Sequence, residues 1–139
     1  MTPKQYLRQA AMIKRQIERT NEQIEEITTL MQNVRAIQYD KINIQSSPSG
    51  DQLINDFIRL DTAKERFIQQ QADYYTIYHT IETQINQIEN ELFRDILVKV
   101  YLKEMPLCDV AKSIYKSEKY IQNKHGEALQ EFGHRFLGC

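Results

Sequence analysis

The sequence is poor in the residues that build turns and small cross-linked folds. It has no tryptophan, four glycines and three prolines. A sandwich or barrel needs many turns, so this composition argues against an all-β fold. The two cysteines, Cys108 and Cys139, do not form a metal-binding pattern. We expect Cys108 to be a buried or partly buried structural thiol and Cys139 an exposed thiol in the tail, because free cysteine usually packs as a small hydrophobic residue.

The sequence also lacks a long apolar run and a strong excess of charge. No run approaches the roughly 20 apolar residues that span a bilayer, and the first four residues lack the apolar core of a signal peptide. We therefore expect a cytoplasmic protein, in a reducing compartment, with no membrane partner. Because 18 basic residues are balanced by 19 acidic ones, any nucleic-acid binding must be local. Residues 46–105 carry six basic and ten acidic residues, whereas residues 1–45 and 106–139 are mildly basic.

Motifs for catalysis and cofactor binding are missing as well. There is no glycine-rich phosphate loop, no nucleophile elbow and no paired carboxylate motif. His79, His125 and His134 have no second ligand at metal spacing beside them. We therefore expect a protein that is not an enzyme, with no catalytic residues, no metal and no cofactor.

Two long segments with a heptad pattern dominate what is present. Residues 3–40 and residues 52–87 each repeat apolar residues at alternating steps of three and four, the spacing of a helical seam. A loop of about residues 41–51 separates them, and Thr2 is the expected N-cap before Pro3. The first seam is Ala10, Ile13, Ile17, Thr20, Ile24, Ile27, Met31 and Val34; the second is Leu53, Phe57, Leu60, Lys64, Phe67, Gln71, Tyr74, Tyr78, Ile81, Ile85, Ile88 and Leu92.

Two helical segments of nearly equal length joined by one loop predict an antiparallel coiled-coil hairpin over residues 1–89, because neither helix is stable without a partner. The second seam is flanked by more apolar residues than a two-helix contact requires. This surplus predicts packing on a second copy of the chain, as a dimer that gives the hairpin a role in oligomerisation or partner binding. The flanking residues are Ile54, Ile58, Ile68, Tyr75 and Ile77.

The pattern changes over residues 90–139. Leu107, Val110, Ala111 and Ile114 have the spacing of a short helix, which follows a turn at residues 103–106. A second turn at residues 115–117 provides Ser117 as N-cap of a final helix, whose apolar side is Ile121, His125, Ala128, Leu129 and Phe132. This spacing predicts a helix-turn-helix domain, in which the final helix is the recognition helix.

Four polar residues are expected to face outward on the first turns of that helix, where a recognition helix presents its base-reading groups. Lysine addresses guanine or phosphate, glutamine and asparagine pair with adenine, and glutamate accepts from cytosine. The predicted base-reading residues are Glu118, Lys119, Gln122 and Asn123. The predicted phosphate contacts are Lys112, Lys116, Ser117, Lys124 and Arg135.

The stretch PLCDVAKSIYKSEKYIQNKHGEAL, residues 106–129, resembles region 4 of bacterial primary sigma-70 factors. With the preceding hairpin, the whole chain resembles the phage-encoded ArpU-type late transcription regulators. The resemblance implies a sequence-specific, duplex-DNA-binding transcription regulator of phage or mobile-element genes. It also implies a bacterial host cytoplasm and host RNA polymerase as a candidate partner. The sigma-factor readers align with Glu118, Lys119, Gln122 and Asn123. Sigma factors usually have arginine, glutamate and arginine at the first three of these positions, so no promoter sequence is carried over.

Two alternative functions remain open at this point. A small terminase-like DNA-packaging subunit also combines a helix-turn-helix with helical oligomerisation segments, and it would assemble into rings instead of dimers. In a protein-interaction module, the hairpin would capture a protein and the C-terminal helices would only pack. Absence of DNA affinity at low salt would favour that second alternative.

Overall fold

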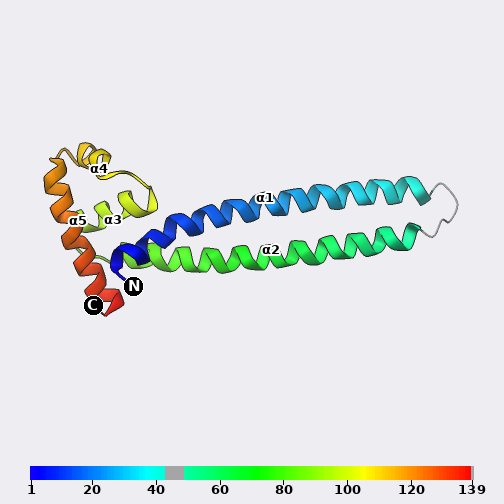
Figure 1. Cartoon of the computed structure of the whole chain (residues 1–139), viewed down its shortest axis with the longest axis horizontal. Coiled ribbons are helices and arrows are strands. Elements are labelled where there is room, and N and C mark those ends of the chain that lie inside the picture. Colours follow the sequence, from blue (N-terminus) through cyan, green and yellow to red (C-terminus); the bar gives the residue numbers. More distant parts are fainter. Residues whose placement is uncertain (43–48, 139) are drawn as a thin grey trace. The chain divides into compact units, whose positions relative to one another are not determined.

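The computed structural model describes residues 1–42 and 49–138. These residues are all-helical, without a β-strand among them, which confirms the predicted fold class at that level. Of the predicted loop at about residues 41–51, residues 43–48 lie outside the described part of the chain. The elements are α1 (Pro3–Ile42), α2 (Ser49–Asn86), α3 (Glu91–Leu97), η1 (Val98–Leu102), α4 (Leu107–Ile114), α5 (Glu118–Phe132) and η2 (Gly133–Leu137), in which η1 and η2 are π-helical (Figure 1).

A capping box begins α1. The backbone N–H of Gln5 donates to Thr2 Oγ1 at 3.2 Å, and the backbone N–H of Thr2 donates to Gln5 Oε1 at 3.0 Å. Each bond satisfies a backbone donor near the helix start, and Pro3 occupies the first helical position, where its missing N–H is not needed. The predicted N-cap at Thr2 is confirmed.

The two long helices pack together along their predicted seams. In the unit formed by residues 16–74, the Gln71 side-chain amide donates to Ile17 O at 3.3 Å and also to Asn21 Oδ1. Farther along, the Arg35 guanidinium lies 5.1 Å from the centre of the Phe57 ring. Because these contacts join increasing positions of α1 to decreasing positions of α2, the helices are antiparallel, as Figure 1 shows.

Residues 1–15 and 75–139 form a second compact unit, in which the C-terminal helices share a core with the first turns of α1 and the last turns of α2. The Tyr6 hydroxyl donates to Gln84 Oε1 at 2.6 Å, and the Tyr6 and Phe132 rings lie 5.8 Å apart. The boundary between the two compact units therefore lies inside both long helices. The sequence predicts a different boundary, between residues 89 and 90, where the hairpin ends and the helix-turn-helix domain begins. The buried residues of this core are Leu7, Ala10, Ile81, Ile85, Ile88, Leu97, Tyr101, Ala128 and Phe132.

The chain breaks its helical path between α2 and α3, although the apolar spacing continues through Ile88 and Leu92. Asn90 has an extended backbone, and its side chain accepts from the backbone N–H of Phe93 at 3.2 Å. Arg94 Nη1 donates to Ile88 O at 3.2 Å. These bonds satisfy backbone groups that a helix end leaves without a partner, so they stabilise a new helix start.

Cys108 is exposed, so the prediction of a buried or partly buried thiol was wrong. The inward side of α4 is set by Val110 and Ala111, with Leu107 and Ile114 packed at its two ends. Cys108 is one residue after Leu107, which turns its side chain by about 100° away from that stripe. Its thiol instead lies 3.8 Å from the Asp109 carboxylate.

Candidate nucleic-acid interface

A small apolar core holds α4 and α5 in place. Ile96 of α3, Val110 and Ala111 of α4, and Ile121 of α5 are buried together. Four of the surrounding hydrophobic residues, Leu92, Met105, Leu107 and Ile114, are partly buried against this cluster. Ala111 is buried at this contact and has a small side chain. The core therefore fixes which side of α5 faces inward.

The turn between α4 and α5 contains a left-handed tyrosine. Tyr115 has φ 62° and ψ 39°, a conformation that glycine adopts most easily at this position after a helix. The backbone N–H of Lys116 donates to Ala111 O at 3.0 Å, and that of Tyr115 to Lys112 O at 3.3 Å. This pair of bonds is a Schellman motif, which satisfies the last carbonyls of α4. The Tyr115 side chain is 93% exposed.

Ser117 caps α5 as predicted. Its backbone is extended, and its Oγ accepts from the backbone N–H of Tyr120 at 3.1 Å. Because the buried Ile121 sets the inward side of α5, the polar residues on the other side of its first two turns are exposed to solvent. Helical spacing places Lys119 and Asn123 near the middle of that face, with Gln122 on one flank. The four predicted base-reading residues, Glu118, Lys119, Gln122 and Asn123, are all exposed.

The predicted phosphate-contacting residues fall into two places. Lys112 lies in the last turn of α4, Lys116 lies in the turn that follows, and Ser117 is the N-cap of α5. Lys124 lies on the second turn of α5, where its ammonium contacts the Glu127 carboxylate at 3.0 Å. That hydrogen bond, with the nearby negative charge, raises the pKa of Lys124.

Arg135 is not brought together with the other phosphate candidates. It lies on η2, where its guanidinium is 5.4 Å from the centre of the Phe136 ring. At 1.5 Å per residue, the helical path from Lys119 to Arg135 covers roughly 20 Å or more. A phosphate contact at Arg135 would therefore use a different part of a ligand.

The sequence interpretation missed Tyr120 as a member of this surface. The ammonium groups of Lys116 and Lys124 lie 5.6 and 5.7 Å from the centre of its ring. These residues stand four positions before and four positions after the tyrosine, so the spacing could have revealed the cluster. Cation–π attraction holds both lysines beside one aromatic ring.

A polar pair lies beneath this surface. The Tyr101 hydroxyl and His125 Nε2 are 2.8 Å apart, and their rings stack with centres separated by 5.7 Å. Burial raises the pKa of Tyr101 to about 12, with the positive charge of Arg8 acting in the opposite direction. Burial, and then the positive charge of Lys4, lowers the pKa of His125. Both groups are therefore neutral near neutral pH, and the pair contributes to packing.

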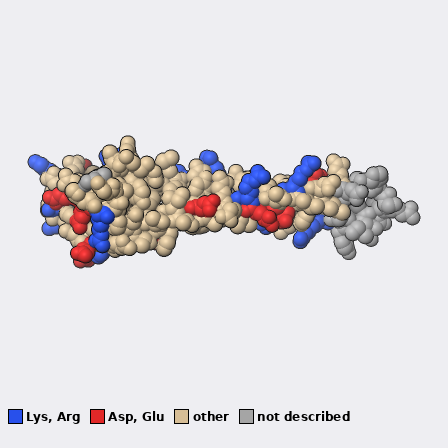
Figure 2. Space-filling view, turned by 90° about the horizontal axis from the view of Figure 1, so that it is seen from below, with Lys and Arg blue, Asp and Glu red and all other residues tan. Residues whose placement is uncertain are grey.

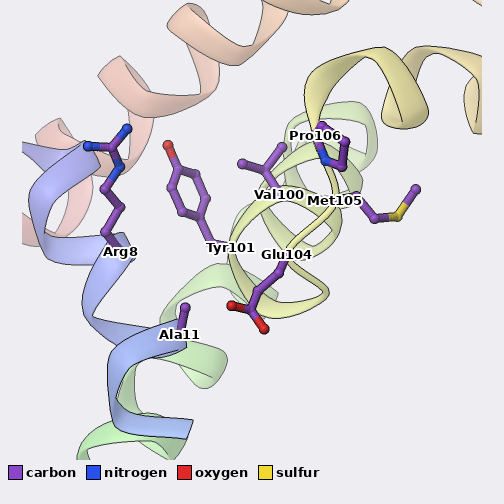
Figure 3. A pocket seen from close by; sticks show the side chains of 7 residues that line it. All are labelled: Arg8, Ala11, Val100, Tyr101, Glu104, Met105 and Pro106. Atoms are coloured by element: carbon purple, nitrogen blue, oxygen red, sulfur yellow. The ribbon is translucent and has the colours of Figure 1, made fainter. Parts of the chain in front are cut away.

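One open pocket of about 340 Å³ lies beside Tyr101. In Figure 3 the Arg8 side chain runs alongside the Tyr101 ring, and the Glu104 carboxylate points toward Ala11. Arg15 forms a 3.3 Å ion pair with Glu104, which itself has φ 54°. The pocket walls are mostly apolar and carry one cation, Arg8, and one anion, Glu104, which is already paired with Arg15. The lining does not place a nucleophile beside a base. Its lining is Arg8, Ala11, Val100, Tyr101, Glu104, Met105 and Pro106.

Charges of both signs are dispersed along the hairpin. Figure 2 shows acidic and basic side chains near one another on the drawn face of α1 and α2. Among residues 1–37 and 52–138, no cluster of three or more His, Cys, Asp or Glu side chains could hold a metal ion. In the same residues, no helix has the length and apolar character needed to cross a bilayer.

Comparisons of the chain with protein-family models, with curated proteins and with solved structures gave no match.

Proposed function

We propose that this chain is a non-enzymatic, sequence-specific duplex-DNA-binding protein in which α4 and α5 act as a helix-turn-helix. In this proposal α5 enters the major groove, with Lys119, Gln122 and Asn123 addressing base edges and Glu118 accepting from cytosine. Lys112, Lys116, Ser117, Lys124 and Arg135 contact phosphates. The gene-control role, as an ArpU-type regulator of phage or mobile-element genes, is the part of the proposal that rests on the sequence resemblance alone.

The observation that carries the proposal is the contrast between the two sides of α5. Ile121, Ala128 and Phe132 are buried, whereas four polar residues on the first two turns are exposed. A helix that only packs needs polar residues on its outer side, but it does not need amide and lysine side chains grouped beside a lysine-bearing turn. This grouping is what a duplex-reading helix requires.

The electrostatics favour an assisted binder. Residues 106–139 carry five basic and four acidic residues, and the 3.0 Å contact with Glu127 already partly neutralises Lys124. Because phosphate neutralisation supplies much of the affinity for DNA, one such domain should bind weakly by itself. A dimer that presents two domains, or host RNA polymerase bound beside the promoter, would supply the missing affinity.

The hairpin offers a surface for that second copy. Leu30 and Ile37 of α1 are exposed, and they line a groove of about 440 Å³ with Val34 and Leu60, while Asp56 and Arg59 supply both charge signs at its edge. An acidic and a basic residue on one groove suit a two-fold interface, in which each pairs with the opposite residue of the other copy. Ile54, Ile58 and Ile68 add exposed apolar area on α2.

Selection of bound fragments from bacterial and prophage DNA with the purified full chain tests this proposal. Wild-type protein should enrich a shared sequence, with and without RNA polymerase. Lys119→Ala should lose the enrichment while retaining weak general affinity, and Glu131→Gln, which changes a charge outside the first two turns of α5, is the matched control. Equal recovery of all fragments by the wild type would contradict sequence-specific binding.

A further inference from the structure

Two tyrosines lie at the start of the proposed recognition helix, Tyr115 in the turn before α5 and Tyr120 on its first turn. Tyr115 is 93% exposed, and Tyr120 is 36% exposed. Tyr120 is flanked by the ammonium groups of Lys116 and Lys124. Tyr115 directly precedes Lys116 in the turn.

The left-handed backbone of Tyr115 makes a tyrosine unexpected at this position. A non-glycine residue in the left-handed region is strained, and strain that persists without a packing reason is a reason to look for function. The side chain of Tyr115 is almost fully exposed, so burial in the protein does not repay that strain. A glycine would satisfy the same Schellman motif more easily.

The chemistry of the cluster fits a phosphate backbone. Tyrosine hydroxyls and lysine ammonium groups are both donors that bind phosphate oxygens in protein–DNA interfaces. One acidic side chain, Glu127, contacts the cluster through Lys124 at 3.0 Å, which leaves Lys116 as the cation with no acidic partner among the ion pairs of the described residues. Both ammonium groups lie beside the ring of Tyr120, at 5.6 and 5.7 Å from its centre.

We propose that Tyr115, Lys116, Tyr120 and Lys124 form a phosphate-binding edge next to the base-reading face of α5. Both tyrosine hydroxyls donate to phosphate oxygens of duplex DNA, and the two lysines supply the positive charge. This inference rests on the proposed function, and it adds two neutral donors to a site whose other proposed phosphate contacts are mostly cationic.

Anisotropy titrations of the full chain with a short labelled duplex of mixed sequence test the edge over a range of salt concentrations. Tyr120→Phe removes one donor to a charged group, so affinity should fall about tenfold. The salt slope should stay unchanged, because the tyrosine is neutral. Lys116→Ala should lower the magnitude of the slope by about 0.9. Gln130→Ala, at an exposed position of α5 beyond its first two turns, should bind as the wild type does.

Tyr115→Gly separates a structural role from a binding role. The variant should unfold at a temperature about 2–4 °C higher, because the left-handed strain is relieved, and it should bind duplex about three- to tenfold more weakly, because a donor is lost. If the wild type binds duplex and both tyrosine variants bind equally well, the inference is wrong and the proposed function stands. If the wild type does not bind at any salt concentration, both are wrong.

Discussion

The Tyr101 hydroxyl and His125 Nε2 lie 2.8 Å apart and join the segment after α3 to the middle of α5. Either group can donate while the imidazole is neutral. Once His125 is protonated, only the ring can donate, and its charge sits in a half-buried place near Lys4. The structure therefore favours the neutral ring.

This pair predicts a loss of stability in mild acid. The folded pKa of His125 is below its ordinary value of 6.5, so the unfolded chain binds a proton more readily. Stability should be independent of this group above pH 6.5 and should fall as pH drops below that value toward the folded pKa. Denaturant unfolding at a series of pH values checks this. His125→Gln keeps a hydrogen-bonding partner for Tyr101 but does not titrate, so the fall should be smaller in that variant. An identical pH profile would contradict the account.

The stability of the C-terminal fold should depend strongly on Ile121 of α5. It is fully buried against Ile96, Val110 and Ala111. Truncation in Ile121→Ala should lower the free energy of unfolding by about 2–4 kcal/mol, because a cavity is left in a small core. Gln122→Ala, at the exposed neighbouring position, should change it by no more than about 0.5 kcal/mol. Comparable losses in the two variants would mean that the inward side of α5 is assigned incorrectly.

Replacing Tyr115 by glycine should stabilise the fold. Relief of the left-handed backbone contributes about 1–2 kcal/mol, and the greater freedom of glycine in the unfolded chain offsets about 0.5–1 kcal/mol of this. A net gain of about 0.5–1 kcal/mol should appear in denaturant unfolding. Tyr115→Ala, which keeps the strain and removes the ring, is the control and should show no such gain.

Base-reading and phosphate-contacting lysines should respond differently to substitution. Lys119→Ala should reduce the preference for the selected sequence by about 1–3 kcal/mol, because a base contact is lost. Lys116→Ala should weaken binding to all sequences alike, since phosphates carry no sequence information. Competition between selected and mixed-sequence duplexes separates the two effects. A uniform loss in both variants would remove the base-reading role of Lys119.

The exposed apolar side of α2 should support self-association. Ile58 is 56% exposed, and a charge there would be unfavourable inside an apolar interface. Sedimentation equilibrium should find a dimer for the wild type and mainly monomer for Ile58→Glu. Asn55→Glu, at a nearby exposed position, should remain dimeric. A wild type that is monomeric at micromolar concentration would contradict the dimer, and a large ring would favour the packaging alternative.

Local signals in the sequence predicted the helices well. The seam spacing, the cap at Thr2 and the cap at Ser117 each depend on neighbouring residues, so periodicity and side-chain chemistry were sufficient. The break at Asn90 was not predicted, because the apolar spacing of a helix continues through Ile88 and Leu92. The Asn90 side chain instead caps the start of a new helix. Periodicity alone does not decide between a continuous helix and a capped restart.

Local spacing also predicted part of the candidate site. The outward position of Lys119 and Asn123 follows from the inward position of Ile121, which the apolar pattern gives. The contact between Tyr101 and His125 joins residues 24 positions apart and depends on how three segments pack. The left-handed backbone at Tyr115 was also beyond sequence reasoning, because glycine is the usual signal for it.

The central claim, that the exposed face at the start of α5 binds duplex DNA, can be tested by mapping backbone amide shifts of the isotope-labelled chain as duplex is added at low salt. The account predicts the largest changes over residues 115–124, with the backbone amides of Ile81 and Ile85 on α2 nearly unaffected. Changes confined to α1 and α2, or no changes at all, would contradict it.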